Sequence, residues 1–260
     1  MLVLNMHNTF HSIMNRSTSA DIDRLQVEVA SELSALGDGT PYVADANEPD
    51  PRYLGYGVRA PEMKRYLRGL KPRFAALDTE DRIELATRLV ASGYGEQKGV
   101  AIALLEKVAE HFTPDRFDQL EDLVGGLHGW SKIDSVTKLF LPTILDRHER
   151  EMIELLGRWN TDDDRWLRRA SVVLFTRKVA RSGLYKDVAL RFCNALLNDN
   201  EHLVQTGVGW CLRDLMRWHK EEILPYVIEL RRMGINGKIT LYALRDIKGE
   251  ERKAILKSST

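Results

Sequence analysis

Apolar side chains recur three and four positions apart through almost the whole chain, with charged residues between them. This spacing places the apolar residues on one face of an α-helix. The alternation of apolar and polar positions that is typical of half-buried strands is not sustained anywhere. The pattern therefore predicts an all-α protein, with helices over residues 21–36, 79–92, 97–112, 115–127, 135–148, 149–159, 163–180, 185–199, 202–218 and 223–234.

Polar residues at the expected helix ends agree with this pattern. Asp78 and Thr113 stand where a side chain can cap the first turn of the following helix, and Asp164 places a carboxylate at another helix start. The pair Gly125-Gly126 indicates the end of a helix rather than a phosphate-binding loop, because no Lys-Ser or Lys-Thr follows it. These signals divide the chain into short helices.

The expected helices come in pairs of similar length, and similar features recur at intervals close to forty residues. This period is typical of HEAT-like repeats, which stack into an α–α superhelix, or solenoid, with one concave face. A compact helical bundle with tryptophans in its core is the alternative. We expect residues 1–20 to form a flexible or weakly ordered extension and residues 21–257 to form a single HEAT-like domain. A tryptophan and a polar residue open the second, more apolar helix of a pair in three places: Trp130 with Asp134, Trp166 with Arg169, and Trp210 with Arg213.

Positions three or four apart share a helical face, so each tryptophan is expected beside its polar partner. If the repeats stack, the three pairs line one groove, which would suit a cationic ligand on an anionic polymer. Simpler interpretations remain open at each position. Asp134 could cap its helix or pair with Lys132 or Lys138, and Arg168 with Arg169 could be a solvated pair. The tryptophans could pack between repeats, which we favour for Trp166.

Charge is unevenly distributed along a chain that has 38 basic and 38 acidic residues. Residues 1–50 hold two basic and eight acidic residues, which leaves 36 basic and 30 acidic residues from position 51 onward. Such a surplus is compatible with nucleic-acid binding and also with solvated helix faces. No apolar run approaches the roughly 18 residues of a membrane span, and the amino terminus lacks a secretory pattern. We expect a cytoplasmic protein without membrane contact.

Cysteine and histidine positions show no metal-site pattern. Cys193 and Cys211 lie in apolar helical stretches and are expected to be small core residues. His128 is expected in a loop and has no second ligand at a metal spacing. The sequence therefore predicts no metal site.

Four stretches together resemble one known family. They are YLGYGVRAPEMKRYLRGL, GWSKIDSVTKLFLPTIL, DDRWLRRASVVLFTRK and HLVQTGVGWCLRDLMRWHKEEILPYV, and they span about residues 50–230 in the same order as in that family. The chain is similar to the AlkD family of HEAT-like alkylpurine DNA glycosylases. The resemblance implies a solenoid that grips duplex DNA in its concave face. It also implies a monofunctional glycosylase of base excision repair that uses no metal or organic cofactor and releases positively charged N3- or N7-alkylated purines, as 3-methyladenine and 7-methylguanine glycosylases do. On this resemblance we expect duplex DNA as the partner, association with the nucleoid when DNA is bound, no obligate protein partner and a monomer.

The resemblance also implies roles for individual residues. Asp134 matches the catalytic carboxylate, Trp130 and Trp210 match lesion-facing rings, and Arg169 matches a DNA-contacting arginine. Two departures stand out, since Arg59 replaces a glutamine and Ser131-Lys132-Ile133 replaces a segment with an acidic residue. The full set of residues expected at the lesion or on DNA is Asp134, Trp130, Trp210, Arg169, Arg213, Arg168 and Arg59.

The chemistry of such a lesion explains why a carboxylate would be required. A purine alkylated at N3 or N7 is positively charged, so its glycosidic bond is weakened and the base can leave without a proton. A carboxylate near C1′ opposes the charge that develops on the sugar and can orient a water. At about 4 Å and an effective dielectric near 20, one such charge contributes about 4 kcal/mol, or roughly a thousandfold in rate. An indole face attracts a cation by about 0.5–2 kcal/mol.

Two other classes of function remain as alternatives. A non-catalytic relative could bind DNA through the same basic groove, and Arg59 and Lys132 keep that reading open. A HEAT-type scaffold for protein interactions is the third hypothesis, for which basic residues and tryptophans would be an unusual groove lining.

Overall fold

The structure, a computed structural model, describes residues 18–40 and 50–257. Within these residues every regular element is helical, and the only strand-like feature is an isolated bridge between Leu54 and Tyr94. The predicted all-α helical-repeat fold is confirmed. No helix in the described part of the chain combines the length and apolar character that a membrane span requires. Most of the predicted extension lies outside the described residues, and the first described helix begins at Ser19.

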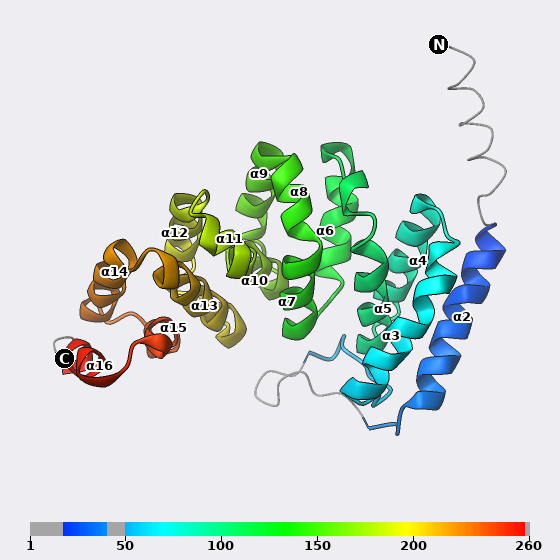
Figure 1. The fold of residues 1–260 in the computed structure, drawn as a ribbon, viewed down its shortest axis with the longest axis horizontal. Helices are drawn as coiled ribbons and strands as arrows, with labels where there is room; N and C mark the ends of the chain where they lie inside the picture. The colour runs from blue at the N-terminus through cyan, green and yellow to red at the C-terminus, as the bar shows by residue number, and fades with distance from the viewer. Residues whose placement is uncertain (1–17, 41–49, 258–260) are drawn as a thin grey trace, which may run out of the picture. The chain divides into compact units, whose positions relative to one another are not determined.

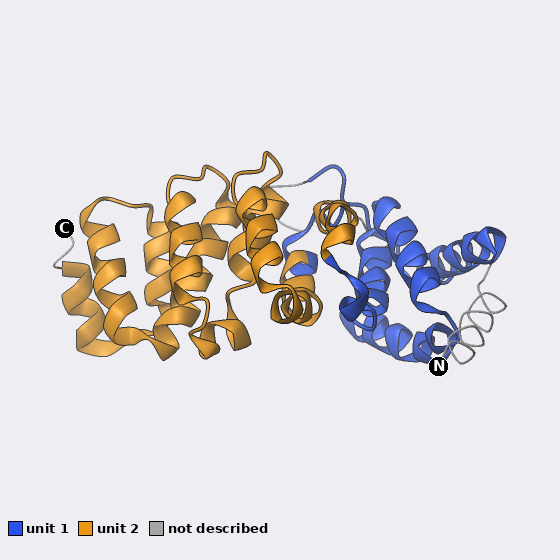
Figure 2. Cartoon of the chain, turned by 90° about the horizontal axis from the view of Figure 1, so that it is seen from above, with its two compact units in different colours: residues 1–113, 126–132 blue, residues 114–125, 133–260 orange. Residues whose placement is uncertain are grey.

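The chain divides into two compact units, which Figure 2 shows in different colours. Unit 1 comprises residues 1–113 and 126–132, and unit 2 comprises residues 114–125 and 133–260. The chain passes between the units at three points, and the last of these, between residues 132 and 133, lies within helix α7 (Trp130–Leu139). The expectation of one solenoid domain over residues 21–257 stays a prediction.

Among its described residues, unit 1 contains four complete helices, one 3-10 turn and the first residues of α7. Helix α4 begins where the sequence predicted, because the Asp78 carboxylate accepts a hydrogen bond from the Asp81 N–H at 2.8 Å. Helix α5 packs against α4, and both contact α2. The elements are α2 (Ser19–Leu36), α3 (Ala60–Ala75), α4 (Thr79–Ala91), α5 (Gly95–Leu105) and the 3-10 turn Ala109–His111.

The described helices of unit 2 are labelled in Figure 1. They are α6 (Phe117–Gly125), α7 (Trp130–Leu139, in this unit from residue 133), α8 (Leu141–Arg147), α9 (Glu149–Trp159), α10 (Arg165–Val173), α11 (Arg177–Ser182), α12 (Lys186–Ala195), α13 (His202–Trp218), α14 (Lys220–Arg232), α15 (Gly237–Ala243) and α16 (Gly249–Lys257), with 3-10 turns at Pro114–Arg116 and Leu244–Asp246.

Helices α10, α13 and α15 form the centre of unit 2, where α13 contacts both of the others. Helix α9 packs against α10, α12 packs against α10 and α13, and α14 packs against α13 and α15. Gly209 permits the close approach of α13 and α15, since a Cβ at this position would lie 2.7 Å from Cβ of Tyr242 and 2.8 Å from the Ile239 carbonyl oxygen. The helices of unit 2 therefore pack as successive neighbours, as expected of helical repeats.

Two expected helices are each divided in the structure. Residues 135–148 belong to α7 and α8, which meet at Phe140, because Pro142 has no N–H for a continuing helix. Residues 163–180 belong to α10 and α11. The break precedes Arg177, whose backbone φ is +54° and whose N–H donates to Asp214 instead of to a helical carbonyl.

Other differences concern helix ends and helices that the pattern missed. Residues 97–112 are α5 followed by a 3-10 turn, so the expected single helix is wrong. Helices α3, α15 and α16 were not predicted; α3 buries Leu70 and Phe74, and α16 buries Ile255. Trp210 lies in the middle of α13, so the expectation that it opens a helix is also wrong.

Candidate functional site: a buried carboxylate–arginine pair beside a covered tryptophan

Asp134 of α7 and Arg169 of α10 form an ion pair in unit 2. Nε and Nη2 of Arg169 donate to Oδ1 of Asp134 at 3.1 and 2.9 Å, and Nη2 also donates to Oδ2 at 3.1 Å. Two nitrogens thus hold one carboxylate, which fixes its orientation. The third nitrogen, Nη1, donates to the Leu203 carbonyl of α13 and lies 3.4 Å from Oγ1 of Thr206. Arg169 therefore ties α7 and α10 to α13.

Gly207 provides the space for this arginine. A Cβ at Gly207 would lie 3.3 Å from Nη1 of Arg169 and 3.2 Å from Cγ2 of Val173. Both distances are tighter than ordinary contacts, so a larger residue would displace the guanidinium or the helix.

The two members of the pair differ in their access to solvent. The Arg169 side chain is 5% exposed, whereas the Asp134 side chain is 13% exposed. Burial raises the pKa of Asp134, while the charges of Arg169 and Arg177 oppose that rise. The carboxylate is therefore the outward-facing member, and the two cations favour its ionised form.

The interpretations of Asp134 as a helix cap or as a partner of neighbouring lysines are wrong. Asp134 lies within α7 rather than at its end. Its ion-pair partner in the described structure is Arg169, not Lys132 or Lys138. Burial lowers the pKa of Lys132, and the charge of Glu96 in unit 1 opposes this.

The arginine that lies over the Trp210 ring of α13 is not the expected one. The Cζ atom of Arg177 lies 4.3 Å from the centroid of the Trp210 ring, whereas Arg213 lies over the Tyr242 ring, at 5.4 Å. The indole Nε1–H donates to Oδ2 of Asp214 at 3.1 Å, and this holds the ring in place. The expected pairing of Trp210 with Arg213 is replaced by a pairing with Arg177.

Asp214 accepts hydrogen bonds from several groups around the Trp210 ring. It is 3% exposed, and its Oδ2 also accepts the backbone N–H of Arg177 at 2.9 Å. Its Oδ1 accepts from Arg213 at 3.1 and 3.3 Å and from Arg217 at 3.3 Å. One buried carboxylate thus orients an aromatic ring and two arginines of α13.

Trp130 and Trp166 have different environments. Trp130 is the first residue of α7 and is 38% exposed, and the helix that places it four positions before Asp134 is present. Trp130 belongs to unit 1, and its contact with DNA stays a prediction. Trp166 is 1% exposed, with the Arg165 guanidinium 5.0 Å from its ring centroid. The interpretation of Trp166 as a packing residue is confirmed.

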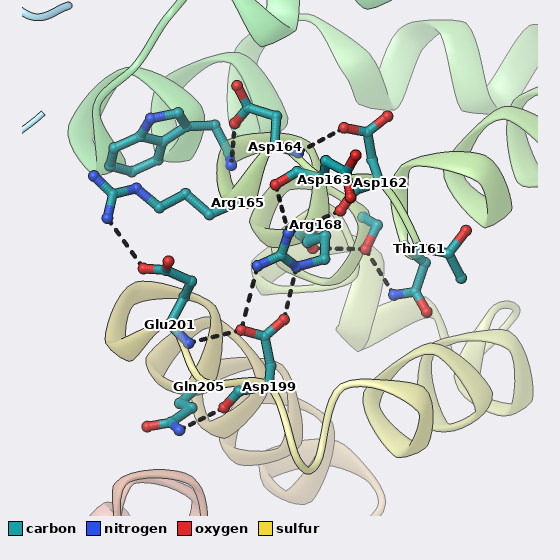
Figure 3. A network of polar contacts seen from close by, with 12 residues as sticks. Thr161, Asp162, Asp163, Asp164, Arg165, Arg168, Asp199, Glu201 and Gln205 are labelled. Carbon is teal, nitrogen blue, oxygen red and sulfur yellow. Dashed lines mark hydrogen bonds and ion pairs between the residues drawn. The ribbon is translucent and has the colours of Figure 1, made fainter.

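Arg168 is engaged in a network within the fold (Figure 3). Its Nε lies 2.7 Å from Oδ2 of Asp199, and its Nη1 donates to the carbonyls of Asp162 and Asp163 at 2.8 and 2.9 Å. The neighbouring pair of Arg165 and Glu201 has an N···O distance of 3.0 Å. These contacts join the loop before α10 to the loop before α13, so Arg168 has a structural role in the fold. The interpretation of Arg168 and Arg169 as a solvated pair is wrong, since each binds a carboxylate.

The remaining expectations can be placed as follows. Arg59 is exposed at the start of α3 in unit 1, so its DNA contact stays a prediction, as do those of Arg169 and Arg213. Cys193 and Cys211 are buried free thiols, as expected. His128 lies in a loop with φ of +50°. No cluster of potential metal ligands occurs among the described residues.

Sequence reasoning missed Arg177 and Asp214. Asp214 stands four positions after Trp210, so the same helical spacing that drew attention to Arg213 could have found it. Arg177 carried no such signal, because its position on the ring depends on a backbone turn and on contact between α11 and α13.

A comparison with known protein families matches most of the chain. A family model described as DNA alkylation repair enzyme matches residues 51–246. The matched range is about three quarters of the chain and contains Asp134, Arg169, Arg177, Trp210 and Asp214. A comparison with curated proteins gives no match.

Proposed function

This chain belongs to the family of DNA alkylation repair enzymes, and we propose that it is a DNA glycosylase for positively charged N3- or N7-alkylated purines in duplex DNA. The observation that carries the proposal is the Asp134 carboxylate, which Arg169 orients and which remains 13% exposed. The ring of Trp210 belongs to the same unit. The proposed product is an abasic site, and the reaction draws on protein side chains and water.

The departing base supplies part of the driving force. As the bond between C1′ and the ring nitrogen breaks, its electron pair goes to the cationic base, which leaves neutral. Positive charge then develops on the sugar. The Asp134 carboxylate opposes that charge, and Oδ2, which accepts one hydrogen bond from Arg169, has lone-pair capacity for a water.

Water completes the reaction. Its oxygen bonds to C1′, and its proton passes to the carboxylate and then to solvent, so atoms and charge balance. Arg169 acts as a positioning residue, because it holds the carboxylate in one orientation and keeps it ionised despite burial. A neutral base would need a protonating group as well, which this mechanism does not include.

Contacts to DNA are proposed for the remaining residues. Trp130 and Trp210 offer aromatic faces to the lesion, and Arg213 and Arg59 offer positive charge to phosphates. Arg169 and Arg168 each have a carboxylate partner within the fold, so a DNA contact from either is proposed only in addition to that ion pair.

The test is release of methylated purine from alkylated duplex DNA by the wild-type protein and by Asp134→Asn. We expect the variant to retain DNA binding and to lose base release by roughly a thousandfold, because the charge opposing the sugar cation is removed. A folded Asp134→Asn protein with unchanged turnover would remove Asp134 from the mechanism. DNA binding without base release by the wild type would instead favour a non-catalytic DNA-binding protein.

A further inference from the structure

An aromatic ring at the end of α15 is in contact with two arginines. The Cζ atom of Arg245 is 4.2 Å from the centroid of the Tyr242 ring, and the Cζ atom of Arg213 is 5.4 Å from it. Arg245 belongs to the 3-10 turn after α15, and Arg213 belongs to α13. Because α13 packs against α15 and also contacts the turn, one ring supports guanidinium groups from two different elements (Figure 1).

The arginines around this ring differ in whether a carboxylate binds them. Arg213 donates to Oδ1 of Asp214 at 3.1 and 3.3 Å, and Arg217 donates to Oδ2 of Asp246 at 2.6 Å. Arg245 is exposed and forms no ion pair with any residue that the structure describes, although Asp246 follows it in the chain. The two carboxylates therefore bind Arg213 and Arg217, and the donors of Arg245 stay available.

Lys248 adds a second exposed cation beside Arg245. Its Nζ donates to the backbone carbonyl of Arg245 at 2.6 Å, which holds the ammonium close to the turn. An ammonium has three donors, so two more hydrogen bonds are open to it. The proposed function gives neither Arg245 nor Lys248 a role.

The carboxylates near this turn do not balance its positive charge. Burial alone would raise the pKa of Asp246, yet that pKa is lowered by Arg217, Arg213 and Lys248. The next carboxylates along the chain, those of α16, bind other lysines: Glu250 pairs with Lys253 and Glu251 pairs with Lys220. The end of α15 therefore presents an excess of positive charge.

A guanidinium that lies over an aromatic ring keeps its N–H edge free. The ring occupies one face of the group, whereas the five N–H bonds point outward in the guanidinium plane. Such an edge matches two oxygens of a phosphate, and an ammonium beside it adds a point charge. Tyr242 therefore restricts the positions of Arg245 without using its donors.

We propose that Arg245 and Lys248 form a phosphate-binding site for the backbone of duplex DNA, with Tyr242 as its positioning residue. The proposal rests on duplex DNA being the partner, as in the proposed function, and it adds a contact that does not depend on a lesion. DNA is the partner that the matched family indicates. An acidic protein segment would also match these cations, and the test distinguishes the two.

The test measures binding to undamaged duplex DNA. Dissociation constants of the wild-type protein and of Arg245→Met are determined by fluorescence anisotropy at salt concentrations between about 50 and 200 mM. The logarithm of Kd rises linearly with the logarithm of the salt concentration, and each phosphate contact contributes about 0.9 to the slope. We expect Arg245→Met to bind about 3- to 10-fold more weakly near 100 mM salt, with a slope smaller by about 0.9.

Arg232→Met is the matched control. Arg232 of α14 is exposed and pairs with an exposed glutamate, Glu229, so the variant loses the same charge from the same unit. Its Kd should change by less than about twofold. Lys248→Met should show the same kind of loss as Arg245→Met. Arg245→Lys should keep the salt slope of the wild type, because a cation remains at the site.

Two substitutions test the positioning role of Tyr242. Tyr242→Phe keeps the ring and should bind DNA as the wild type does. Tyr242→Leu should bind about 2- to 5-fold more weakly, and most of this loss should disappear when Arg245 is already replaced by Met, because the ring acts through that guanidinium. Circular dichroism checks that each variant is folded. An equal loss in both backgrounds would show that Tyr242 does not position Arg245.

Two results would overturn the phosphate site. If Arg245→Met binds undamaged DNA as Arg232→Met does, the cations at this turn serve another anion, such as an acidic protein segment. If the affinity falls while the salt slope stays the same, no phosphate contact has been lost. Base release is not measured, so a wild-type protein that binds DNA without glycosylase activity contradicts the proposed function alone. A wild-type protein that does not bind DNA contradicts both.

Discussion

Two neighbouring arginines of α10 each bind a carboxylate, but the two pairs differ in which partner is more exposed to solvent. Arg168 is 16% exposed and its partner Asp199 is 6% exposed, whereas Arg169 is 5% exposed and its partner Asp134 is 13% exposed. Asp199 also accepts the backbone N–H of Glu201 at 2.8 Å, so its oxygens are used inside the fold. In one pair the acid is enclosed, and in the other the acid faces outward.

This comparison shows that an ion pair by itself does not identify a site. The Arg168 pair closes two loops on each other, and its carboxylate receives donors from side chain and backbone. The Arg169 pair presents a carboxylate whose remaining lone pairs are available, at a position where burial raises its pKa. Which partner faces solvent separates a structural pair from a candidate catalytic one.

The strongest challenge to this comparison is to remove each arginine in turn. Arg169→Met should lower base release by roughly a hundredfold or more, because Asp134 loses its orienting partner and the charge that keeps it ionised. Arg168→Met should leave the rate per folded molecule within about threefold of the wild type. Single-turnover rates on methylated duplex DNA measure both. Equal losses would mean that the two pairs do not differ in role.

Stability should respond at the other pair. Arg168→Met should lower the free energy of unfolding by about 1–3 kcal/mol, because it leaves the buried Asp199 carboxylate without its main partner. Thermal or urea unfolding, followed by circular dichroism, measures the loss. Arg150→Met, in an exposed pair with Glu154 on α9, is the control and should change stability by less than about 0.5 kcal/mol. Matching losses in the two variants would argue against a structural role for Arg168.

The pH dependence sharpens the distinction further. The pKa of Asp134 is raised by burial, so we expect base release to be constant at neutral pH and to fall as the pH drops through a pKa above the usual value near 3.8. The raised pKa also means that ionisation of Asp134 disfavours the folded state, so its contribution to stability is greatest below about pH 3.8 and is lost as the pH rises through the folded-state pKa. Arg169→Lys should show this fall in rate in the same pH range, and Arg169→Met should show it at higher pH. Rates measured from about pH 8 down to about pH 3.5 test this, and a rate that rises with acidity would exclude Asp134 as the ionised group.

The smallest expected effect is at Gly207. Gly207→Ala would place a Cβ 3.3 Å from Nη1 of Arg169, so the guanidinium or α13 has to shift slightly. We expect base release to fall about 3- to 10-fold with a change in unfolding free energy of about 1 kcal/mol. Gly157→Ala, whose Cβ would lie 3.9 Å from Phe192, is the control and should leave the rate unchanged. Equal rates in both variants would show that Arg169 tolerates displacement.

Helical spacing recovered much of the fold because short-range hydrogen bonding and burial of one face are local properties. It failed at Pro142 and at Arg177, where the chain breaks a continuous apolar pattern. The break at Pro142 could have been predicted from the sequence, since a proline has no N–H to continue a helix. The break at Arg177 was not, because the acceptor of its N–H, Asp214, lies 37 positions away.

The sequence by itself determined that the chain is helical, that Asp134 lies in a helix that Trp130 opens, and that four motifs stand in the order of a DNA alkylation repair family. Only the tertiary structure decided that Asp134 pairs with Arg169, that Arg168 serves Asp199, and that Arg177 covers Trp210. The reason is geometric. Adjacent helical residues point about 100° apart, so their spacing gives each a direction, but the partner in that direction is supplied by whichever helix packs there.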